Sequence, residues 1–296
     1  MPTLGPLSES RVRSSLNRDP ALKNQPEYQF DMKLRLDDGI ELFYTIDDFT
    51  NPWTEPETVL MHHGMAKSHK MWFGWVPIIA QHYRVIRFDM RGMGLSDVSG
   101  PDHAWTLDSF TSDLKEFVDK MELDKFHLIG ETVGGSISMN FSINNQERLR
   151  SLTVCTSPTN FDSHHKESAD LIDREGINVW VEQSIGRRLD PQIVDPAYIR
   201  WYAEQMKATP AHVVSGFQRN AAGDIGPMLK DVQTPMLMLA AANLREEVLG
   251  DFRGAADLFP NGRKVIFPGV YGFVQHIMPV PCARVWLDFA HSLNET

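Results

Sequence analysis

Short runs of apolar residues recur along most of the chain, and stretches with helical periodicity separate them. An amphipathic stretch at 106–121, a helix near 70–80 and a last helix at about 280–292 are expected between or after these runs. Strands that alternate with helices predict an α/β fold, with a mostly parallel sheet covered by helices on both faces. The apolar runs expected to be strands are 58–61, 84–88, 126–129, 152–155, 235–239 and 264–267.

The segment before this pattern has two parts. Residues 28–36 and 40–47 alternate apolar and polar positions around Asp37-Asp38-Gly39, which predicts a β-hairpin with glycine at its turn. Residues 1–27 are polar and lack periodicity. We expect them to form an N-terminal extension, lying on the surface or packed against the domain as an arm.

The strand signal stops between residues 158 and 229. This segment carries Trp180, Trp201, Tyr202 and Phe217 at helical spacings. The predicted organisation is therefore a sheet-based core, 28–157 and 230–296, interrupted by a helical cap at 158–229. We expect the aromatic residues both to form a small core of the cap and to face a cavity.

The composition narrows the class of protein. The 296 residues carry a net charge of −10, which argues against nucleic acid or an anionic membrane as the main partner. No apolar stretch approaches the roughly 18 residues that span a bilayer. The N-terminus lacks the apolar segment of about 7–15 residues that a secretory signal requires. The chain is expected to be soluble and cytoplasmic.

The stretch Gly130-Glu131-Thr132-Val133-Gly134 is the most informative motif. An apolar strand enters a tight turn framed by glycines, and a small-residue helix leaves it. Such a turn presents its central side chain, here Thr132, on a strained corner above the sheet, beside free N–H groups of the helix start. Two further turns, His62-His63-Gly64-Met65 and the stretch 88–97, each follow a predicted strand.

With these motifs the chain resembles the α/β-hydrolase superfamily, in its cap-bearing branch of ester, lactone and carbon–carbon-bond hydrolases. The resemblance covers residues 28–292. It implies a catalytic histidine after the last strand, where His276 lies, and an oxyanion hole made by the backbone N–H groups of Val133 and Met65.

The remaining histidine and pocket positions are assigned more loosely. His62 and His63 are expected to shape the loop beside the site, and His63, Trp180 and Trp201 to line the substrate pocket. Neither the histidine pairs nor the two cysteines have metal-ligand spacing. A Gly-rich phosphate loop is also missing, so we expect no metal and no cofactor.

The sequence departs from the family at two positions. Thr132 stands where the nucleophilic serine is usual, as a natural residue or an engineered replacement; its β-branch crowds the turn. The acid that should orient the histidine falls on Leu244. Asn243 is a neutral substitute for it, and a shifted loop would bring Glu246 or Glu247 there. Cys155 is expected to be a buried apolar residue, not a nucleophile.

Three functions follow from these observations. The first is a hydrolase of a small apolar ester, lactone or carbon–carbon-bonded ketone, acting through Thr132 and His276 with a backbone oxyanion hole. The second is a cofactor-independent lyase, isomerase or decarboxylase that uses His276 and the oxyanion hole without an acyl-enzyme. The third is a ligand-binding protein without catalysis. Each function implies a small apolar or aromatic molecule as the partner. The sequence is compatible with both a monomer and a homodimer.

Overall fold

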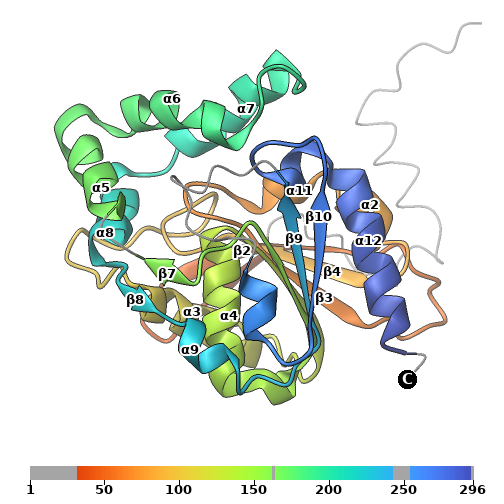
Figure 1. Ribbon diagram of the computed structural model, residues 1–296. Coiled ribbons are helices and arrows are strands. Elements are labelled where there is room, and N and C mark those ends of the chain that lie inside the picture. Colours follow the sequence, from red (N-terminus) through yellow and green to blue (C-terminus); the bar gives the residue numbers. More distant parts are fainter. Residues whose placement is uncertain (1–31, 162–163, 243–253, 295–296) are drawn as a thin grey trace, which may run out of the picture. The chain divides into compact units, whose positions relative to one another are not determined.

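The computed structural model describes residues 32–161, 164–242 and 254–294, and residues 32–296 form one compact unit. The predicted extension at 1–27 lies outside the described residues. An eight-stranded sheet runs through the unit in the order β1-β2-β4-β3-β5-β6-β9-β10 (Figure 1). Its strands are β1 (Met32–Arg35), β2 (Glu41–Asp47), β3 (Thr58–His62), β4 (Arg84–Phe88), β5 (Phe126–Glu131), β6 (Leu149–Cys155), β9 (Met236–Ala241) and β10 (Gly262–Phe267).

The sheet is mostly parallel, as the alternation of strands and helices predicts. Strands β4, β3, β5, β6, β9 and β10 pair in parallel, and only the hairpin β1–β2 and the β2–β4 pair are antiparallel. Every residue of β5 and of β9 is buried. These strands are covered on both faces, which explains why apolar residues dominate their sequences.

Helices pack on the two faces of this sheet. Helix α3 (Leu107–Lys120) packs against α4 (Val133–Asn145), and α12 (Pro279–Ser292) packs against α2 (Val76–Ile79). Figure 1 shows these two pairs on opposite sides of the strands. The fold class predicted from the sequence is thereby confirmed. The shorter helical elements of the unit are η2 (His69–Trp72), η3 (Gln146–Arg148), α9 (Gly226–Leu229), η4 (Ala255–Leu258) and α11 (Val274–Ile277).

The start of α3 shows why its boundary is sharp. Thr106 Oγ1 accepts the N–H of Ser109, and the N–H of Thr106 donates to Ser109 Oγ, both at 3.1 Å. This reciprocal capping box satisfies donors that the first helical turn leaves unpaired. The expected amphipathic stretch at 106–121 therefore corresponds to this helix with its two flanking residues.

The single helix predicted near 70–80 is wrong: the segment forms η2 and α2, separated by Gly74. A Cβ at Gly74 would lie 2.7 Å from Cβ of Pro279, so helix α12 approaches the backbone here too closely for any side chain. Pro77, in the first turn of α2, lacks the N–H that a continuous helix would use.

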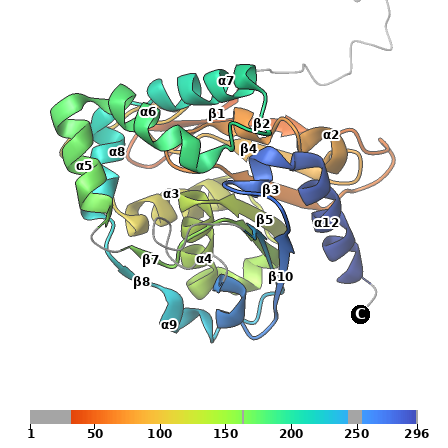
Figure 2. The ribbon, with the colours of Figure 1, turned by 45° about the horizontal axis from the view of Figure 1, so that its top comes forward.

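A helical segment is inserted between β6 and β9. It contains α5 (His164–Glu175), α6 (Ile177–Arg188), α7 (Pro196–Lys207) and α8 (Ala211–Asn220). Figure 2 shows α5 to α8 beside the sheet, on the side reached by β7 and β8. Strands β7 (Asn160–Phe161) and β8 (Gly223–Asp224) pair antiparallel and bring its two ends together.

The inserted segment contacts the core at several points. A Cβ at Gly216 in α8 would lie 2.7 Å from the Trp105 ring, so the helix backbone lies directly on that indole. On the other side, Leu189 forms an isolated bridge with Gly272, and the N–H of Phe273 donates to the Arg188 carbonyl at 2.8 Å. No helix among the described residues is long and apolar enough to cross a membrane.

Candidate functional site

Thr132 occupies the turn between β5 and α4. Its backbone has φ 48° and ψ −123°, a region that a β-branched residue rarely adopts. The N–H of Thr132 donates to the Cys155 carbonyl at 2.9 Å, which ties the turn to the end of β6. The side chain is 9% exposed and lies directly before the first turn of α4. The turn therefore holds Thr132 in the position that the motif predicts.

The loop after β3 packs directly against this turn. A Cβ at Gly64 would lie 1.9 Å from Thr132 Oγ1, and a Cβ at Gly134 would lie 2.1 Å from the His63 carbonyl. Any residue other than glycine would push the two segments apart. Both glycines are thus required for the approach of the loop to Thr132.

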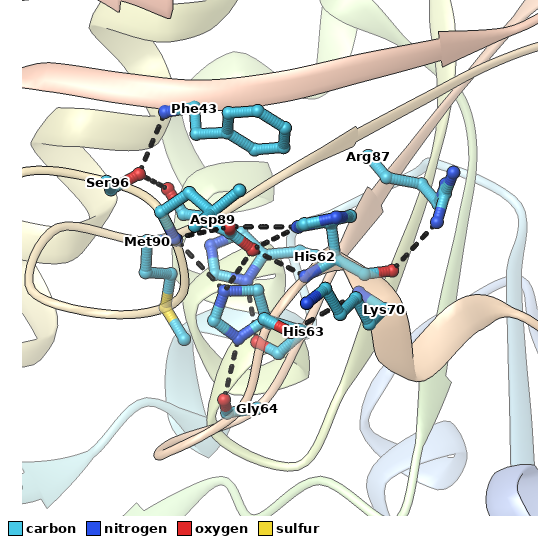
Figure 3. A network of polar contacts seen from close by, with 12 residues as sticks. Phe43, His62, His63, Gly64, Lys70, Arg87, Asp89, Met90 and Ser96 are labelled. Carbon is cyan, nitrogen blue, oxygen red and sulfur yellow. Dashed lines mark hydrogen bonds and ion pairs between the residues drawn. The ribbon is translucent and has the colours of Figure 1, made fainter. Parts of the chain in front are cut away.

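His62 and His63 hold this loop in place (Figure 3). His63 Nε2 accepts the Met90 N–H at 2.9 Å, so the proton is on Nδ1, which donates to the Gly64 carbonyl at 2.8 Å. His62 Nδ1 lies 3.1 Å from the His63 carbonyl. Burial lowers the pKa of both rings, that of His62 to about 3. Both side chains are buried and bonded to backbone, so they shape the loop; His63 offers no exposed surface to a pocket.

Asp89 fixes the next loop beneath the same residues. Its carboxylate accepts the His69 N–H at 2.5 Å, His69 Nδ1 at 2.9 Å and the Leu95 N–H at 2.9 Å. Burial alone would raise the pKa of Asp89, but the hydrogen bond from His69 and the nearby histidines lower it. Figure 3 shows the carboxylate inside this network, where it holds the surrounding loops together.

His276 lies in α11, after β10, and is brought to the same end of the sheet. Its Nε2 atom is 2.6 Å from Oε2 of Glu131, the residue directly before Thr132. Its Nδ1 atom is buried and has no hydrogen-bond partner among the described residues. The sequence left Asn243, Glu246 and Glu247 as the candidates to orient His276, and Glu131 was not among them; the structure brings Glu131 to this histidine.

Glu131 is the centre of a buried polar cluster. Its Oε2 atom accepts Lys67 Nζ at 2.7 Å and Gln275 Nε2 at 2.9 Å in addition to His276. Its Oε1 atom accepts the Gly64 N–H at 3.2 Å. The side chain is fully buried, and these donors replace the water that an ionised carboxylate loses on burial.

The charges in this cluster depend on one another. Burial opposes the ionised form of Glu131, but the neighbouring His276 and Lys67 hold the pKa of the carboxyl well below its ordinary value. Burial lowers the pKa of Lys67 to about 8, against the attraction of Glu131. Burial also lowers the pKa of His276. At neutral pH the cluster thus holds a carboxylate, an ammonium group and a neutral imidazole.

Aromatic rings from the inserted segment and the 268–276 loop close over the cluster. The Tyr202 ring, on α7, lies 5.2 Å from the His276 ring, and Lys67 Nζ lies 5.5 Å from the Tyr202 centroid. Lys67 Nζ also lies 4.8 Å from the centroid of the Phe273 ring. Such ring faces attract a cation and exclude water from it.

The two tryptophans predicted to line a pocket lie around this region. Trp201 stacks on Tyr198 and meets Phe73 of the core edge-on. Trp180 is nearly buried and lies beneath the Arg188 guanidinium, whose carbon is 4.8 Å from its ring centroid. Trp201 therefore joins the inserted segment to the core, and Trp180 packs within the segment.

The remaining candidate residues are Asn243, Glu246, Glu247 and Cys155. Asn243, Glu246 and Glu247 lie outside the described residues. Cys155 is buried, and burial raises the pKa of its thiol well above the ordinary value, which disfavours the thiolate. Within the described ranges, no three histidine, cysteine or acidic side chains converge as metal ligands.

Sequence reasoning missed Glu131, Lys67 and Gln275. One signal was available: Glu131 closes a strand whose other residues, apart from His127, are apolar or glycine, and a carboxylate at such a position must find buried donors. The partners themselves were not visible, because Lys67 is 64 residues before Glu131 and His276 is 145 residues after it.

Comparisons with known proteins agree with this architecture. A family model described as alpha/beta hydrolase fold matches residues 57–185. The protein named carbamate hydrolase RutD of Rhizobium rhizogenes is 24% identical over 200 residues, 62% of this chain and 74% of that protein. The 2-hydroxy-6-oxo-6-(2'-aminophenyl)hexa-2,4-dienoic acid hydrolase of Metapseudomonas resinovorans is 28% identical over 166 residues, 53% of this chain and 56% of that protein.

The solved structures give the same fold. The enol-lactonase of Burkholderia xenovorans LB400 superposes with a TM-score of 0.78 at 18% identity, over 87% of this chain and 99% of that chain. The mostly parallel sheet with a strained turn between β5 and α4 defines an α/β-hydrolase fold. The chain therefore has an α/β-hydrolase fold, and residues 57–185 match the model of that fold family.

Proposed function

We propose that this protein is a hydrolase of a small ester, lactone or carbon–carbon-bonded ketone, with Thr132 as its nucleophile. The conformation of Thr132 is the observation that carries the proposal. A non-glycine residue in this region costs on the order of 1–3 kcal/mol and persists only where the surrounding structure enforces it. A turn that keeps a hydroxyl on this corner supports a reactive role for Thr132 Oγ1.

The oxyanion hole is proposed at the N–H groups of Val133 and Met65. Val133 is the first residue of α4, so its N–H has no carbonyl within the helix to bond. Neither this N–H nor that of Met65 has an acceptor among the described residues. Two free N–H groups beside the nucleophile are what stabilises a developing oxyanion.

The proton from Thr132 would pass to the cluster of His276, Lys67 and Glu131. These groups have lowered pKa values and are buried beside the turn. The named hydrolase relatives and the enol-lactonase support a carbonyl substrate attacked at this position. The aromatic rings over the cluster support a small apolar or aromatic partner molecule.

The experiment is turnover of p-nitrophenyl acetate and p-nitrophenyl butyrate by the parent chain and by Thr132→Ala, Thr132→Ser and Thr54→Ala. We expect Thr132→Ala to lose at least 100-fold in kcat/KM, and Thr132→Ser to match or exceed the parent because serine lacks the crowding methyl. Thr54→Ala, at an exposed loop position, is the matched control. A fluorophosphonate should label Thr132 alone in a peptide map; unchanged turnover by Thr132→Ala would refute the proposal.

One observation favours a second function. His276 Nε2 is bonded to Glu131, and no hydrogen bond joins it to Thr132 among the described residues. The cluster would then move protons directly on a bound carbonyl compound, as a lyase, isomerase or decarboxylase without an acyl-enzyme. In that case Thr132→Ala keeps its activity, His276→Ala loses it, and the fluorophosphonate has no effect.

A further inference from the structure

Lys67 lies in the loop that places Met65 beside the turn. It is 2% exposed, and its ammonium group contacts Glu131 Oε2 at 2.7 Å. A buried lysine loses the water around its charge and is retained only where other groups compensate that loss. Here one carboxylate and two aromatic rings do so, which leaves the lysine beside Thr132 with no contact to bulk solvent.

Gly64 shows how close Lys67 Nζ is to the hydroxyl of Thr132. The Cβ position built on Gly64 is 1.9 Å from Thr132 Oγ1 and 3.1 Å from Lys67 Nζ. The two atoms are therefore at most the sum of these distances, 5.0 Å, apart. Catalytic hydrogen bonds that are long before substrate binds often tighten in the complex, and a rotation of the Lys67 side chain would shorten this distance.

His276 is less available for the same proton. Its Nε2 atom lies 2.6 Å from a carboxylate oxygen, so it carries a hydrogen that it donates to Glu131. Nε2 therefore has no free lone pair with which to accept a proton. Lys67 Nζ lies 3.3 Å from Nε2, but it donates to the same Glu131 oxygen and not to the imidazole. The imidazole holds Glu131 and does not accept from Thr132 in this arrangement.

The charged groups around Lys67 set its basicity. Burial and the charge of Arg188 lower its pKa while Glu131 raises it, and the net result is a pKa of about 8. His276 is neutral when buried, and the Cys155 thiol and Tyr202 hydroxyl stay protonated because burial raises the pKa of each. Near pH 8 a substantial fraction of Lys67 is therefore a neutral amine.

We propose that Lys67 is the catalytic base and acid for Thr132, and that Glu131 and His276 are positioning residues that hold its amine beside the hydroxyl. This assignment rests on the proposed function, in which Thr132 is the nucleophile. It differs from the role of His276 that the sequence implies, because the acid–base step is carried by a residue from the loop after β3. Serine–lysine pairs on other folds use the same chemistry.

The neutral Lys67 amine takes the proton of Thr132 Oγ1, Oγ1 bonds to the substrate carbonyl carbon, and the π electrons move to the carbonyl oxygen. The oxyanion re-forms its double bond as the leaving group departs with the proton from Lys67. Water then repeats the sequence on the acyl-threonine, which gives the acid product and restores the hydroxyl and the neutral amine.

The test is the pH dependence of fluorophosphonate labelling of Thr132, measured as a second-order rate constant between pH 6 and pH 10. In the parent chain we expect the rate to rise with pH, to reach half its maximum near pH 8 and to level off above that pH. Lys67→Arg keeps the charge but cannot give up its proton, so the rate should fall at least 100-fold and lose this inflection. Lys67→Met should behave alike, and Lys115→Met, at an exposed ion-paired lysine, should match the parent.

Two further measurements keep the test decisive. The double variant Lys67→Met/Glu131→Gln removes both charges and so leaves no unpaired buried carboxylate. It replaces Lys67→Met in the labelling experiment if that single variant does not fold. Near-parent labelling by a folded Lys67→Arg or by this pair, with the inflection retained, would overturn the role of Lys67. Full turnover by Thr132→Ala would instead refute the proposed function, so the two failures are distinguishable.

Discussion

The carboxylate of Glu131 lies 2.6 Å from Nε2 of His276, and the two residues are 145 positions apart in the chain. This contact joins the turn that carries Thr132 to the loop after the last strand. In a Ser-His-Asp triad the acid bonds Nδ1 and leaves Nε2 to the nucleophile. Here Nε2 is the atom that meets the acid, and Nδ1 has no partner among the described residues.

Replacing Glu131 by glutamine should both weaken catalysis and destabilise the fold. The Lys67 ammonium would remain buried without its counter-charge, and breaking a buried pair in this way costs about 3–5 kcal/mol. We expect urea unfolding of Glu131→Gln to show a loss of this size, and ester turnover to fall at least 100-fold. Adding Lys67→Met should recover part of the stability, since the unpaired charge is then gone.

Glu57 supplies the matched control for that experiment. It also pairs with a histidine, His127, at 3.1 Å, but its side chain is 26% exposed. Water can replace the lost contact there, so Glu57→Gln should cost no more than about 1 kcal/mol. Equal losses for the two variants, or strictly additive effects in the Glu131–Lys67 cycle, would contradict the coupling described above.

Thr132→Gly and Thr132→Ala both remove the hydroxyl, and the glycine variant should be the more stable of the two. Glycine adopts φ 48° without the steric cost that a β-branched residue has. We therefore expect Thr132→Gly to unfold with a free energy about 1 kcal/mol higher than Thr132→Ala, which keeps the strain. Thermal unfolding of the two inactive variants gives the comparison, and a less stable glycine variant would show that the turn is not strained.

Acid should destabilise the protein before its carboxylates titrate. Burial lowers the pKa of His62 from 6.5 to about 3, and the pKa values of His63 and His276 shift in the same direction. Between these values the unfolded chain binds more protons than the folded chain, so stability falls as the pH drops below 6.5. Each fully shifted histidine contributes about 1.4 kcal/mol per pH unit in this window.

Urea unfolding between pH 7 and pH 5 measures this slope. The pKa of Glu131 is also held low, so its contribution is present above pH 4.5 and is lost only as the pH falls further. His62→Gln should flatten the curve above pH 5, because one titrating ring is removed. A stability that does not change between pH 7 and pH 5 would exclude neutral buried histidines.

Tyr202 stabilises the folded protein through the packing of its ring and not through its hydroxyl. The hydroxyl is buried with no hydrogen-bond partner among the described residues, so Tyr202→Phe should leave stability unchanged or raise it by up to about 1 kcal/mol. Tyr202→Ala opens a cavity and should cost about 3–5 kcal/mol. Thermal unfolding distinguishes the two, and a large loss for Tyr202→Phe would reveal a polar contact of the hydroxyl.

Much of the fold could be predicted from the sequence because the parallel strands are covered on both faces. Continuous apolar runs gave each central strand, with ends displaced by a few residues, as for 126–129 against Phe126–Glu131. The strand extends beyond the apolar run, through Gly130 to Glu131, and hydrophobicity alone does not reveal this extension. The segment at 70–80 failed because the close approach of Pro279 to Gly74 has no local signature.

The site could be predicted only as far as its local motif. The turn around Thr132 is defined by adjacent residues, and a pattern reveals it. The cluster at Glu131 is assembled by packing of three distant segments: one contributes Lys67, one Glu131, and one both Gln275 and His276. Charge pairing of this kind depends on burial, which a single sequence does not display.

The paired strands β7 and β8 have an evolutionary consequence. Asn160 pairs with Asp224 and Phe161 with Gly223, so the two ends of the polypeptide between them lie side by side in a small sheet of their own. Closing a longer or shorter loop across a fixed pair costs little additional entropy. Helices α5 to α8 can thus be replaced as a unit in evolution. Such a replacement can alter which molecules reach Thr132 while the register of the main sheet stays the same.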